Sequence, residues 1–501
     1  MIRLELQFQK QAHSCLKPIL QETKHQELTQ ELRLGDGMPD VGRILGTWGV
    51  PIIRSKQWSS DQITVSGGII AWVLYAPEDG SECRSVDLWM PFQMRWDIPA
   101  MDRDGTIRVT PLLRNADSRA LSSRKIMVRA GLAIHGQALC PMDFEIAEPG
   151  EMPEGVELLK RTYPIRLMKG TGEKVFTVDE EFNLPEHQAA PVKILRNLVK
   201  PEIIEKKILG DKVLFRGNLN LHLLYRDEEG NIHSWNGSLA FSQFEETDFP
   251  MDSDGRLDID MLVTGLELDL VDHRLHLKCT LAAQYLVDEQ MLVELVQDAY
   301  GVNRDVVAQE ETVNLPVILE QRTDTFNAEQ TIHNNGCQVL DAVFLPDFPH
   351  HRRSSSDSDV ELAGTFYLLT CNEDGTIQGS TAHWEDNKSL EASENCVMNT
   401  MITSLGNVQT MDTAGGTSLS VSGQMESTTG TNQELMMITG LELGAQRVEY
   451  PERPSLILCK PGKENLWNIA KRCGSTVGAI QRANKLDEEP PEDRMILIPV
   501  S

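Results

Sequence analysis

Apolar and polar residues alternate in two stretches of this chain, and each stretch ends at a turn of acidic residues and glycine. In residues 213–225 every second position is apolar, with Gly217 in one of these places, and the acidic turn follows at residues 226–230. Residues 63–80, 150 positions earlier, keep the same phase, with Gly67 in the equivalent place. A period of two predicts half-buried β-strands. Both glycines are expected in mid-strand, where a side chain would collide with a facing element or where a bulge is needed.

A third, weaker copy of this pattern covers residues 360–375. It is two residues shorter between its glycine, Gly364, and the turn. A deletion of two residues keeps the same side chains facing the core, whereas a deletion of one residue would move every side chain to the opposite face of the strand. A polar loop is expected at residues 350–359, and residues 413–431 are rich in Gly, Ser and Thr. We therefore expect the third copy to be degenerate and looser than the others.

Matches at the same spacing continue over roughly a hundred residues, which is typical of an internal repeat. Leu34 matches Leu184, for example, and Gly105 matches Gly255. The segment 156–163 is matched by 293–300 near the end of each copy. The sequence thus predicts a mainly β chain in five parts: a strand and short helix in 1–30, three tandem β-rich repeat domains at 31–163, 164–305 and 306–450, and a tail at 454–501.

The tail has a different periodicity. Two short apolar runs, 456–458 and 496–499, flank two segments with helical spacing, and Thr476 is placed to cap the second of them. The order predicted is βααβ. Its core is expected to consist of Leu466, Ile469, Ala470, Ile480 and Ala483.

Charge and composition exclude several classes of function. The net charge is −28, whereas a nucleic-acid-binding protein needs a basic face. No apolar run approaches the roughly 20 residues that span a bilayer, and residues 1–30 carry charges throughout, so we expect a cytoplasmic protein without a transmembrane segment. The nine cysteines are scattered without a C-x-x-C pair, which favours reduced thiols over disulfides or a zinc site.

Candidate catalytic and metal-binding motifs do not meet the requirements of their chemistry. Residues 170–174 lack the spacing of a phosphate-binding loop, and residues 252–255 lack the oxygen ligands of a calcium loop, so turns are expected at both. His273 and His276 are interpreted as a surface pair rather than a metal site. We therefore expect that the protein is not an enzyme and that it binds no metal and no cofactor. An active site within a repeat is disfavoured, because the repeats have in common their turns and the positions of their apolar residues rather than clusters of polar residues.

Two segments resemble known families. Residues 458–486, LCKPGKENLWNIAKRCGSTVGAIQRANKL, followed by ILIP, are similar to a LysM module. The repeats resemble the SPOCS domain, with its Ile-Leu opening, a glycine-centred strand ending in Leu-Tyr and an acidic-glycine turn. Several such domains before one LysM module resemble the layout of the SipL-like proteins of endospore-forming clostridia. That resemblance implies a scaffold in the mother-cell cytoplasm, at the forespore surface, that binds the morphogenetic ATPase of the coat's basement layer.

In LysM modules the glycan lies between the loop after the first strand and the loop before the last. The matching partner-binding or glycan-binding positions are Gly462, Lys463, Glu464, Asn465, Leu466, Leu486, Asp487 and Glu488. The first loop is one residue longer than usual and the second is acidic, which favours a protein partner. The alternative is a protein that binds peptidoglycan glycan, rich in N-acetylglucosamine, in the cell wall or spore cortex. Trp467 is expected in the core rather than as a sugar-stacking platform.

Overall fold

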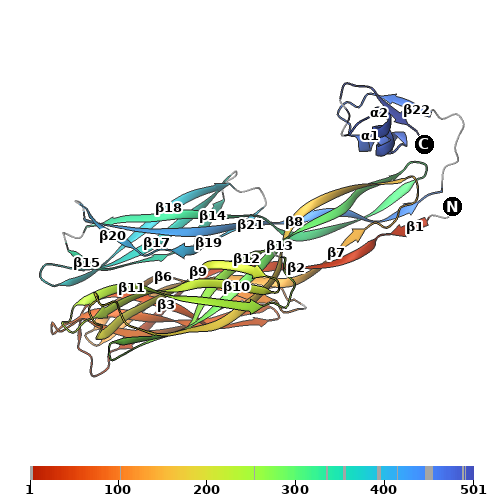
Figure 1. Ribbon diagram of the computed structural model, residues 1–501. Helices are drawn as coiled ribbons and strands as arrows, with labels where there is room; N and C mark the ends of the chain where they lie inside the picture. Colours follow the sequence, from red (N-terminus) through yellow and green to blue (C-terminus); the bar gives the residue numbers. More distant parts are fainter. Residues whose placement is uncertain are drawn as a thin grey trace.

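The described part of the chain consists almost entirely of antiparallel strands (Figure 1). The computed structural model describes residues 4–101, 103–252, 254–333, 337–353, 357–391, 396–413, 416–445, 455–487, 490 and 492–500. Among these described residues there are two short helices, both in the tail. Neither helix has the length and apolar character needed to cross a membrane. The prediction of a mainly β protein is confirmed.

The first group of strands forms two three-stranded sheets, ordered β2-β7-β6 and β3-β4-β5. Its strands are β2 (Gln9–Arg33), β3 (Val41–Ser59), β4 (Gln62–Pro77), β5 (Arg84–Asp97), β6 (Thr106–Ser122) and β7 (Lys125–Glu148). The first strand thus pairs with the sixth, the sixth with the fifth, and the third strand lies between the second and fourth.

The short helix expected within residues 1–30 is absent, and this prediction is wrong. Residues 9–33 form the single strand β2, which pairs with β7 along its length. The proline that interrupts the apolar pattern, Pro18, stands at a bulge, where its missing N–H group does not break the ladder. The boundary expected at residue 30 therefore falls inside β2, and the one at residue 163 falls inside β8.

A second group of six strands repeats this pairing. Its sheets are β8-β13-β12 and β11-β10-β9. The strands are β8 (Val156–Phe182), β9 (Lys193–Leu209), β10 (Lys212–Arg226), β11 (Ile232–Glu246), β12 (Arg256–Val271) and β13 (Arg274–Gly301).

In the third group the strands equivalent to the second and fifth are each broken in two. Here β17 pairs with β15, β16 and β18, while β21 pairs with β14, β19 and β20. Residues 416–443, within which a loose, Ser- and Thr-rich segment was expected, form one long strand instead. Side chains of this strand alternate between the core and the surface, and the small polar residues occupy both faces, since Thr417, Ser427 and Thr429 are buried. The bounds are β14 (Val306–Ile332), β15 (Gln338–Pro346), β16 (His350–Arg353), β17 (Asp357–Cys371), β18 (Ile377–Glu391), β19 (Val397–Leu405), β20 (Gln409–Thr413) and β21 (Gly416–Leu443).

The glycines at the centre of the sequence pattern lie in mid-strand, as predicted. A Cβ atom on Gly67 would lie 2.0 Å from the carbonyl oxygen of Ile52, and one on Gly217 would lie 2.1 Å from that of Glu202. Both positions adjoin a bulge in the neighbouring ladder. The neighbouring strand therefore approaches so closely that any side chain would collide with its backbone. The glycine that ends each acidic turn has a positive φ, at Gly80, Gly230 and Gly375.

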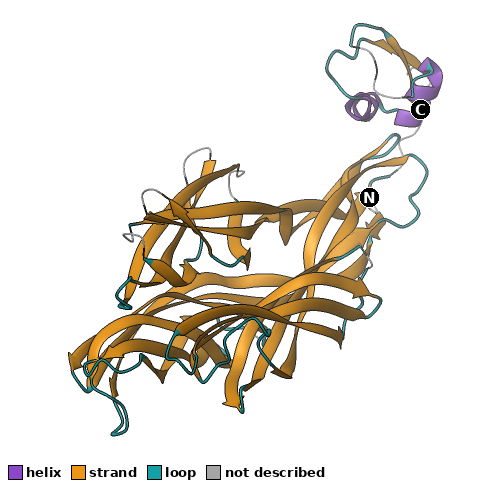
Figure 2. Cartoon of the chain, turned by 60° about the vertical axis from the view of Figure 1, so that its left-hand side comes forward, coloured by secondary structure: helices purple, strands orange, loops and turns teal. Residues whose placement is uncertain are grey.

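The longest strands extend beyond their sheets and form a stalk, which comprises residues 4–18, 139–168, 291–318 and 430–443. Figures 1 and 2 show the ribbons β2–β7, β8–β13 and β14–β21 leaving the body side by side. Strand β1 (Leu4–Gln7) pairs with the end of β21. Buried side chains from all three ribbons share one apolar cluster, which includes Phe144, Leu167, Leu295, Leu315 and Met437. The three groups are therefore joined through a common core.

The tail has the predicted order βααβ. It consists of β22 (Leu456–Cys459), α1 (Leu466–Cys473), α2 (Val477–Asn484) and β23 (Ile496–Pro499). Four of the expected core residues, Leu466, Ile469, Ala470 and Ile480, are buried. Ala483 is exposed, and the prediction for it is wrong, because Asn484 takes the inward position one turn after Ile480 and binds β23.

Candidate interaction sites

The two predicted tail loops lie next to each other. The backbone N–H of Gly462 donates to the carbonyl oxygen of Glu492 at 3.3 Å, and Lys460 pairs with Asp493 at 3.3 Å. Gly462, Lys463 and Asp487 are exposed. The fold thus brings the two loops to one surface. Glu488 and its neighbour Glu489 lie outside the described residues.

Four other predicted contact residues have structural roles within the tail. Leu466 is 2% exposed and belongs to the core. The side chain of Asn465 accepts a hydrogen bond from the N–H of Asn468 at 2.9 Å and so caps α1. Glu464 pairs with Arg472 at 2.9 Å. Leu486 is half-buried against the core. The free charge on this surface is therefore smaller than the sequence alone suggests.

The tail is docked on the tip of the stalk through Trp467. This side chain is only 8% exposed, as expected, and its ring meets that of Tyr300 edge-on at 4.8 Å between centroids. Its indole N–H donates to Asp298 at 2.8 Å, and Lys471 binds both oxygens of the same carboxylate at 2.8 Å. Burial would raise the pKa of Asp298, but the hydrogen bonds from Lys471 and Trp467 outweigh burial and lower it.

A second set of contacts completes this docking interface. The hydroxyl of Tyr300 donates to the carbonyl oxygen of Ser475 at 2.9 Å, and Val302 joins the apolar cluster of the tail. Burial raises the pKa of Tyr300. The sequence pattern marked Tyr300 as the end of a repeat, matched by Tyr163, but did not predict its contact. Tyr163 packs in the stalk instead.

Within the body, the three strand groups meet at a buried ion pair that the sequence did not predict. Arg196 of the second group and Asp341 of the third are 0% and 1% exposed, and their side chains form two hydrogen bonds, of 2.6 and 3.2 Å. His222 lies 2.7 Å from the same carboxylate, and Trp48 of the first group stacks on the guanidinium at 4.7 Å. Burial would raise the pKa of Asp341, but Arg196 and His222 lower it far below its usual range.

A second cluster, in which Arg108 is buried and the two aspartates are half-buried, joins the first and second groups. Arg108 donates to Asp258 at 2.7 Å and to Asp260 at 3.0 Å. Burial raises the pKa of Asp260 to about 6, although Arg108 opposes this rise. The clusters at Arg196 and Arg108 fix the orientation of the three groups, because charged hydrogen bonds of this kind are directional.

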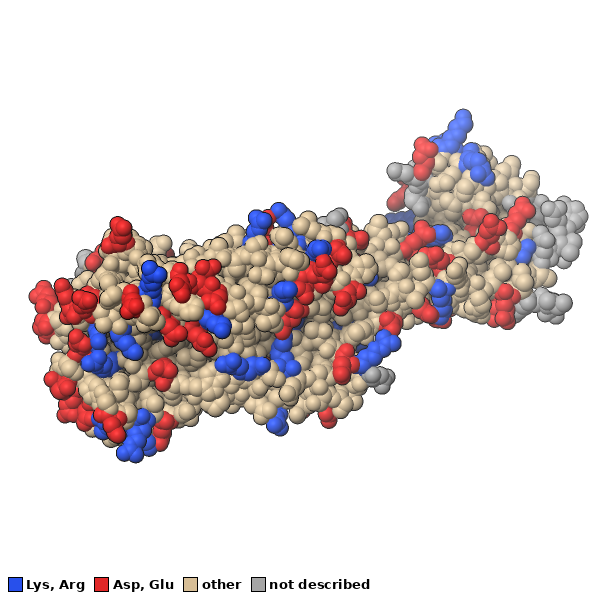
Figure 3. Space-filling model, turned by 60° about the horizontal axis from the view of Figure 1, so that its bottom comes forward, with Lys and Arg blue, Asp and Glu red and all other residues tan. Residues whose placement is uncertain are grey.

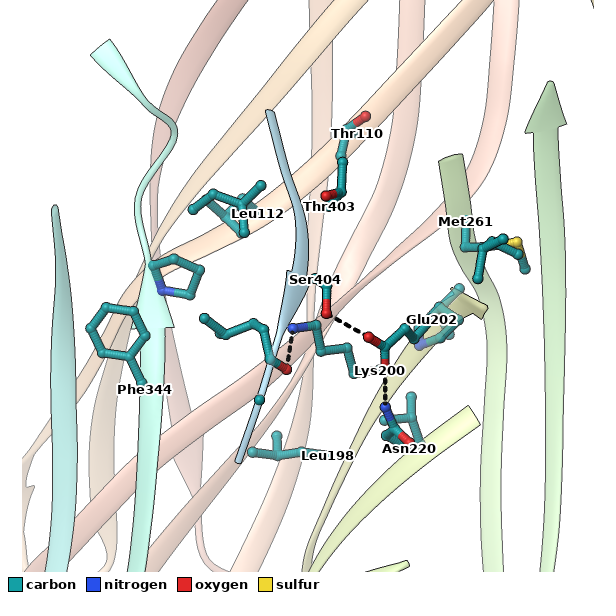
Figure 4. Close-up of a pocket in the computed structure, with 18 of the residues that line it drawn as sticks. Thr110, Leu112, Leu198, Lys200, Glu202, Asn220, Met261, Phe344, Thr403 and Ser404 are labelled. Atoms are coloured by element: carbon teal, nitrogen blue, oxygen red, sulfur yellow. Dashed lines mark hydrogen bonds between the residues drawn. The ribbon is translucent and has the colours of Figure 1, made fainter. Parts of the chain in front are cut away.

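A cavity of about 570 Å³ lies where strands of the three groups meet (Figure 4). On its wall Lys200 donates to the carbonyl oxygen of Leu405 at 3.0 Å, and Glu202 accepts from Ser404 and, at 2.9 Å, from Asn220. Burial lowers the pKa of Lys200 to about 8. The volume is within the range of small-molecule sites. However, these polar groups bind each other or the backbone, so they serve to hold the groups together.

The other candidates from the sequence have structural explanations. Residues 170–174, expected as a turn, lie within β8, where Gly170 makes room for the ring of Phe249. The turn expected at residues 252–255 is present. His276 pairs with Asp179, whereas His273 contacts the carbonyl oxygen of Pro191. No group of His, Cys, Asp and Glu in the described ranges is arranged to hold a metal ion.

On the face shown in Figure 3, acidic and basic side chains are interspersed along the body and do not form one basic patch. This agrees with the negative net charge.

Comparison with known families identifies one part of the body. Residues 192–271 match the family model described as SipL, SPOCS domain. The matched SPOCS segment runs from β9 to β12 and contains both Arg196 and Gly217. It supports the resemblance to SipL-like proteins and indicates a protein associated with the spore coat. No match was found among curated proteins or among solved structures.

Proposed function

We propose that this protein is a non-enzymatic scaffold of spore-coat assembly. In this proposal three SPOCS-like units form one rigid body, and a LysM-like tail binds the coat morphogenetic ATPase at the forespore surface, in the mother-cell cytoplasm. The observation that carries the proposal is the strand pairing. The group that contains the matched SPOCS segment has the same pairing scheme as the groups before and after it.

The equivalent glycines support three related units. Gly67, Gly217 and Gly364 occupy the central strand of the β3, β9 and β15 sheets, and a Cβ atom on each would lie within 2.2 Å of an atom of the strand or ring beside it. Such a close approach between strands requires glycine at this one position, whereas a general preference for β-structure would not. Its recurrence in three sheets favours one domain type used three times.

The buried ion pairs support a scaffold with a fixed shape. Each unit contributes a charged or aromatic side chain to the contact at Arg196, and the cavity wall is held by hydrogen bonds between units. A catalytic site needs a nucleophile or base directed toward a substrate position. Here the side chains of Arg196 and Asp341 are directed toward each other, which favours a structural role for this buried pair.

The tail is suited to partner binding because it is presented in one orientation. Asp298 and Tyr300 hold α1 against the stalk, while the loops at Lys463 and Asp487 remain exposed on the tail surface. A preoriented surface loses less entropy on binding than a freely tethered one. The same exposed loops form the surface at which the alternative function, glycan binding, would occur.

Two measurements test the proposed function. A fluorescent fusion of the full chain is imaged in sporulating cells, where a ring around the forespore is expected. In parallel, the purified chain is incubated with the recombinant ATPase and with insoluble peptidoglycan, and a variant truncated after residue 445 serves as the control. The proposal expects ATPase capture that depends on the tail. Retention by peptidoglycan without ATPase capture, or a fusion located at the cell wall, would favour the glycan alternative.

A further inference from the structure

The outer face of the tail's two-stranded sheet carries an apolar stripe that faces solvent. Its members are Leu456, Leu458, Met495 and Leu497, whose exposed fractions are 56%, 63%, 52% and 39%. The alternate residues of the same strands, among them Ile496 and Ile498, lie in the core. A module of this size has little surface, so four exposed large side chains on one face are a large share of it.

One edge of this sheet is closed, and the other has no partner among the residues that the structure describes. On β23 the side chain of Asn484 binds both backbone groups of Leu497, at 2.7 Å to its N–H and 2.5 Å to its carbonyl oxygen. On β22 the register places Ile457 opposite Ile498, and the N–H of Val500 donates to Ser455 at 3.0 Å. Because hydrogen bonding alternates along an antiparallel pair, the backbone groups of Leu456 and Leu458 point away from β23. No described residue binds them.

We propose that β22 accepts an added strand, namely an extended apolar segment of the partner protein bound by the tail. This inference rests on the proposed function and names the surface that carries it. The added strand would pair with the free backbone groups at Leu456 and Leu458. Its apolar side chains would lie beside the stripe and remove these leucines from water.

The size of the stripe favours another protein over a second copy of this chain. The four side chains expose roughly 400 Å² in total, so a face-to-face pair of tails would bury about 800 Å², below the ~1,200 Å² of stable interfaces. Strand addition supplies backbone hydrogen bonds that a face-to-face pair lacks. The stripe is also continuous with the predicted loops, since β22 leads into Lys460 and β23 follows Asp493. Lys460 and Asp493 form an ion pair, so their charges neutralise each other.

The docking interface leaves this edge accessible in the full chain. Figure 1 shows β22 on the side of the tail away from the stalk, with α1 between them. Trp467 and Ser475, which contact the stalk, belong to α1 and the turn after it. Docking on the stalk and strand addition at β22 thus use different faces of the tail.

Variants of the full chain test this proposal, with the recombinant morphogenetic ATPase as the probe. Leu458→Pro removes an outward N–H group at an edge position, where proline is tolerated, and the double variant Leu456→Thr, Leu458→Thr removes the apolar side chains but keeps the edge. Each is expected to weaken ATPase binding about tenfold or more, since 1.4 kcal/mol corresponds to tenfold. Leu292→Thr is the matched control, because Leu292 is 68% exposed on the stalk. It should bind as the wild type does.

Amide hydrogen exchange separates strand addition from other modes of binding. In the free chain the amides of Leu456 and Leu458 should exchange quickly, whereas those of Ile457 and Cys459 are protected by β23. In the complex all four should be protected. Binding by both variants at wild-type affinity, or no new protection, would overturn strand addition and leave the proposed function standing. Absence of ATPase binding by the wild type would overturn both. Self-association abolished by the double variant would assign the stripe to a second copy and overturn the proposed partner.

Discussion

The chain joins its parts in two different ways. At the body junction, Arg196 and Asp341 are both at most 1% exposed. At the docking interface, the side chains of Asp298 and Lys471 are 33% and 45% exposed. Breaking a buried ion pair leaves a charged group in the interior with no water to solvate it. The members of a half-exposed ion pair, in contrast, are solvated when they separate. This difference indicates that the body cannot open without unfolding. The tail, in contrast, can separate from the stalk while it remains folded.

Removing the buried carboxylate should have the largest effect. Asp341→Ala leaves Arg196 and His222 without their partner and is expected to cost about 3–5 kcal/mol of the free energy of unfolding. The measurement is the midpoint of urea unfolding of the full chain. Glu385→Ala is the control, since Glu385 pairs with His383 at the surface. A loss for Asp341→Ala no larger than that of the control would contradict the difference between the two junctions.

Truncation in the core of the tail should unfold the tail and spare the body. Ile469 is 0% exposed, and Ile469→Ala is expected to cost about 2–5 kcal/mol. Calorimetry of the full chain should then show a separate, earlier transition for the tail. If the tail and body still melted together at the wild-type temperature, the tail would not unfold separately from the body.

A side chain at the central glycine should destabilise the second unit. Gly217→Ala places a Cβ atom 2.1 Å from the carbonyl oxygen of Glu202, and overpacking of this kind costs about 1–3 kcal/mol. Gly35→Ala is the matched control, because nothing lies within 4 Å of its Cβ position. Equal unfolding midpoints for the two variants would show that the strands can separate at Gly217 without cost.

The sequence predicted features that depend on neighbouring residues better than those that depend on distant ones. Alternation located the strand around Gly217, and helical spacing located Ile469 in the core of the tail. The contact between Arg196 and Asp341 joins positions 145 residues apart on different sheets, and no local pattern encodes such a pair. The error at residues 9–33 has the same origin, because a mixed apolar pattern became a strand through pairing with β7. The docking of Trp467 likewise depends on where the stalk ends.

The smallest expected effect is a pH-dependent release of the tail. The pKa of Asp298 is lower in the docked state than in the free state, so its contribution to docking is present above the free-state pKa of about 4 and is lost as the pH falls through the docked-state value. Because the pair is partly solvated, this contribution is below about 1 kcal/mol. Small-angle X-ray scattering should therefore show a larger radius of gyration near pH 3 than at pH 7, if the body remains folded by circular dichroism. Asp298→Asn, which removes the charge, should reduce this difference between the two pH values. A variant that kept the full pH response would show that other groups control docking, and that Asp298 only orients the indole of Trp467.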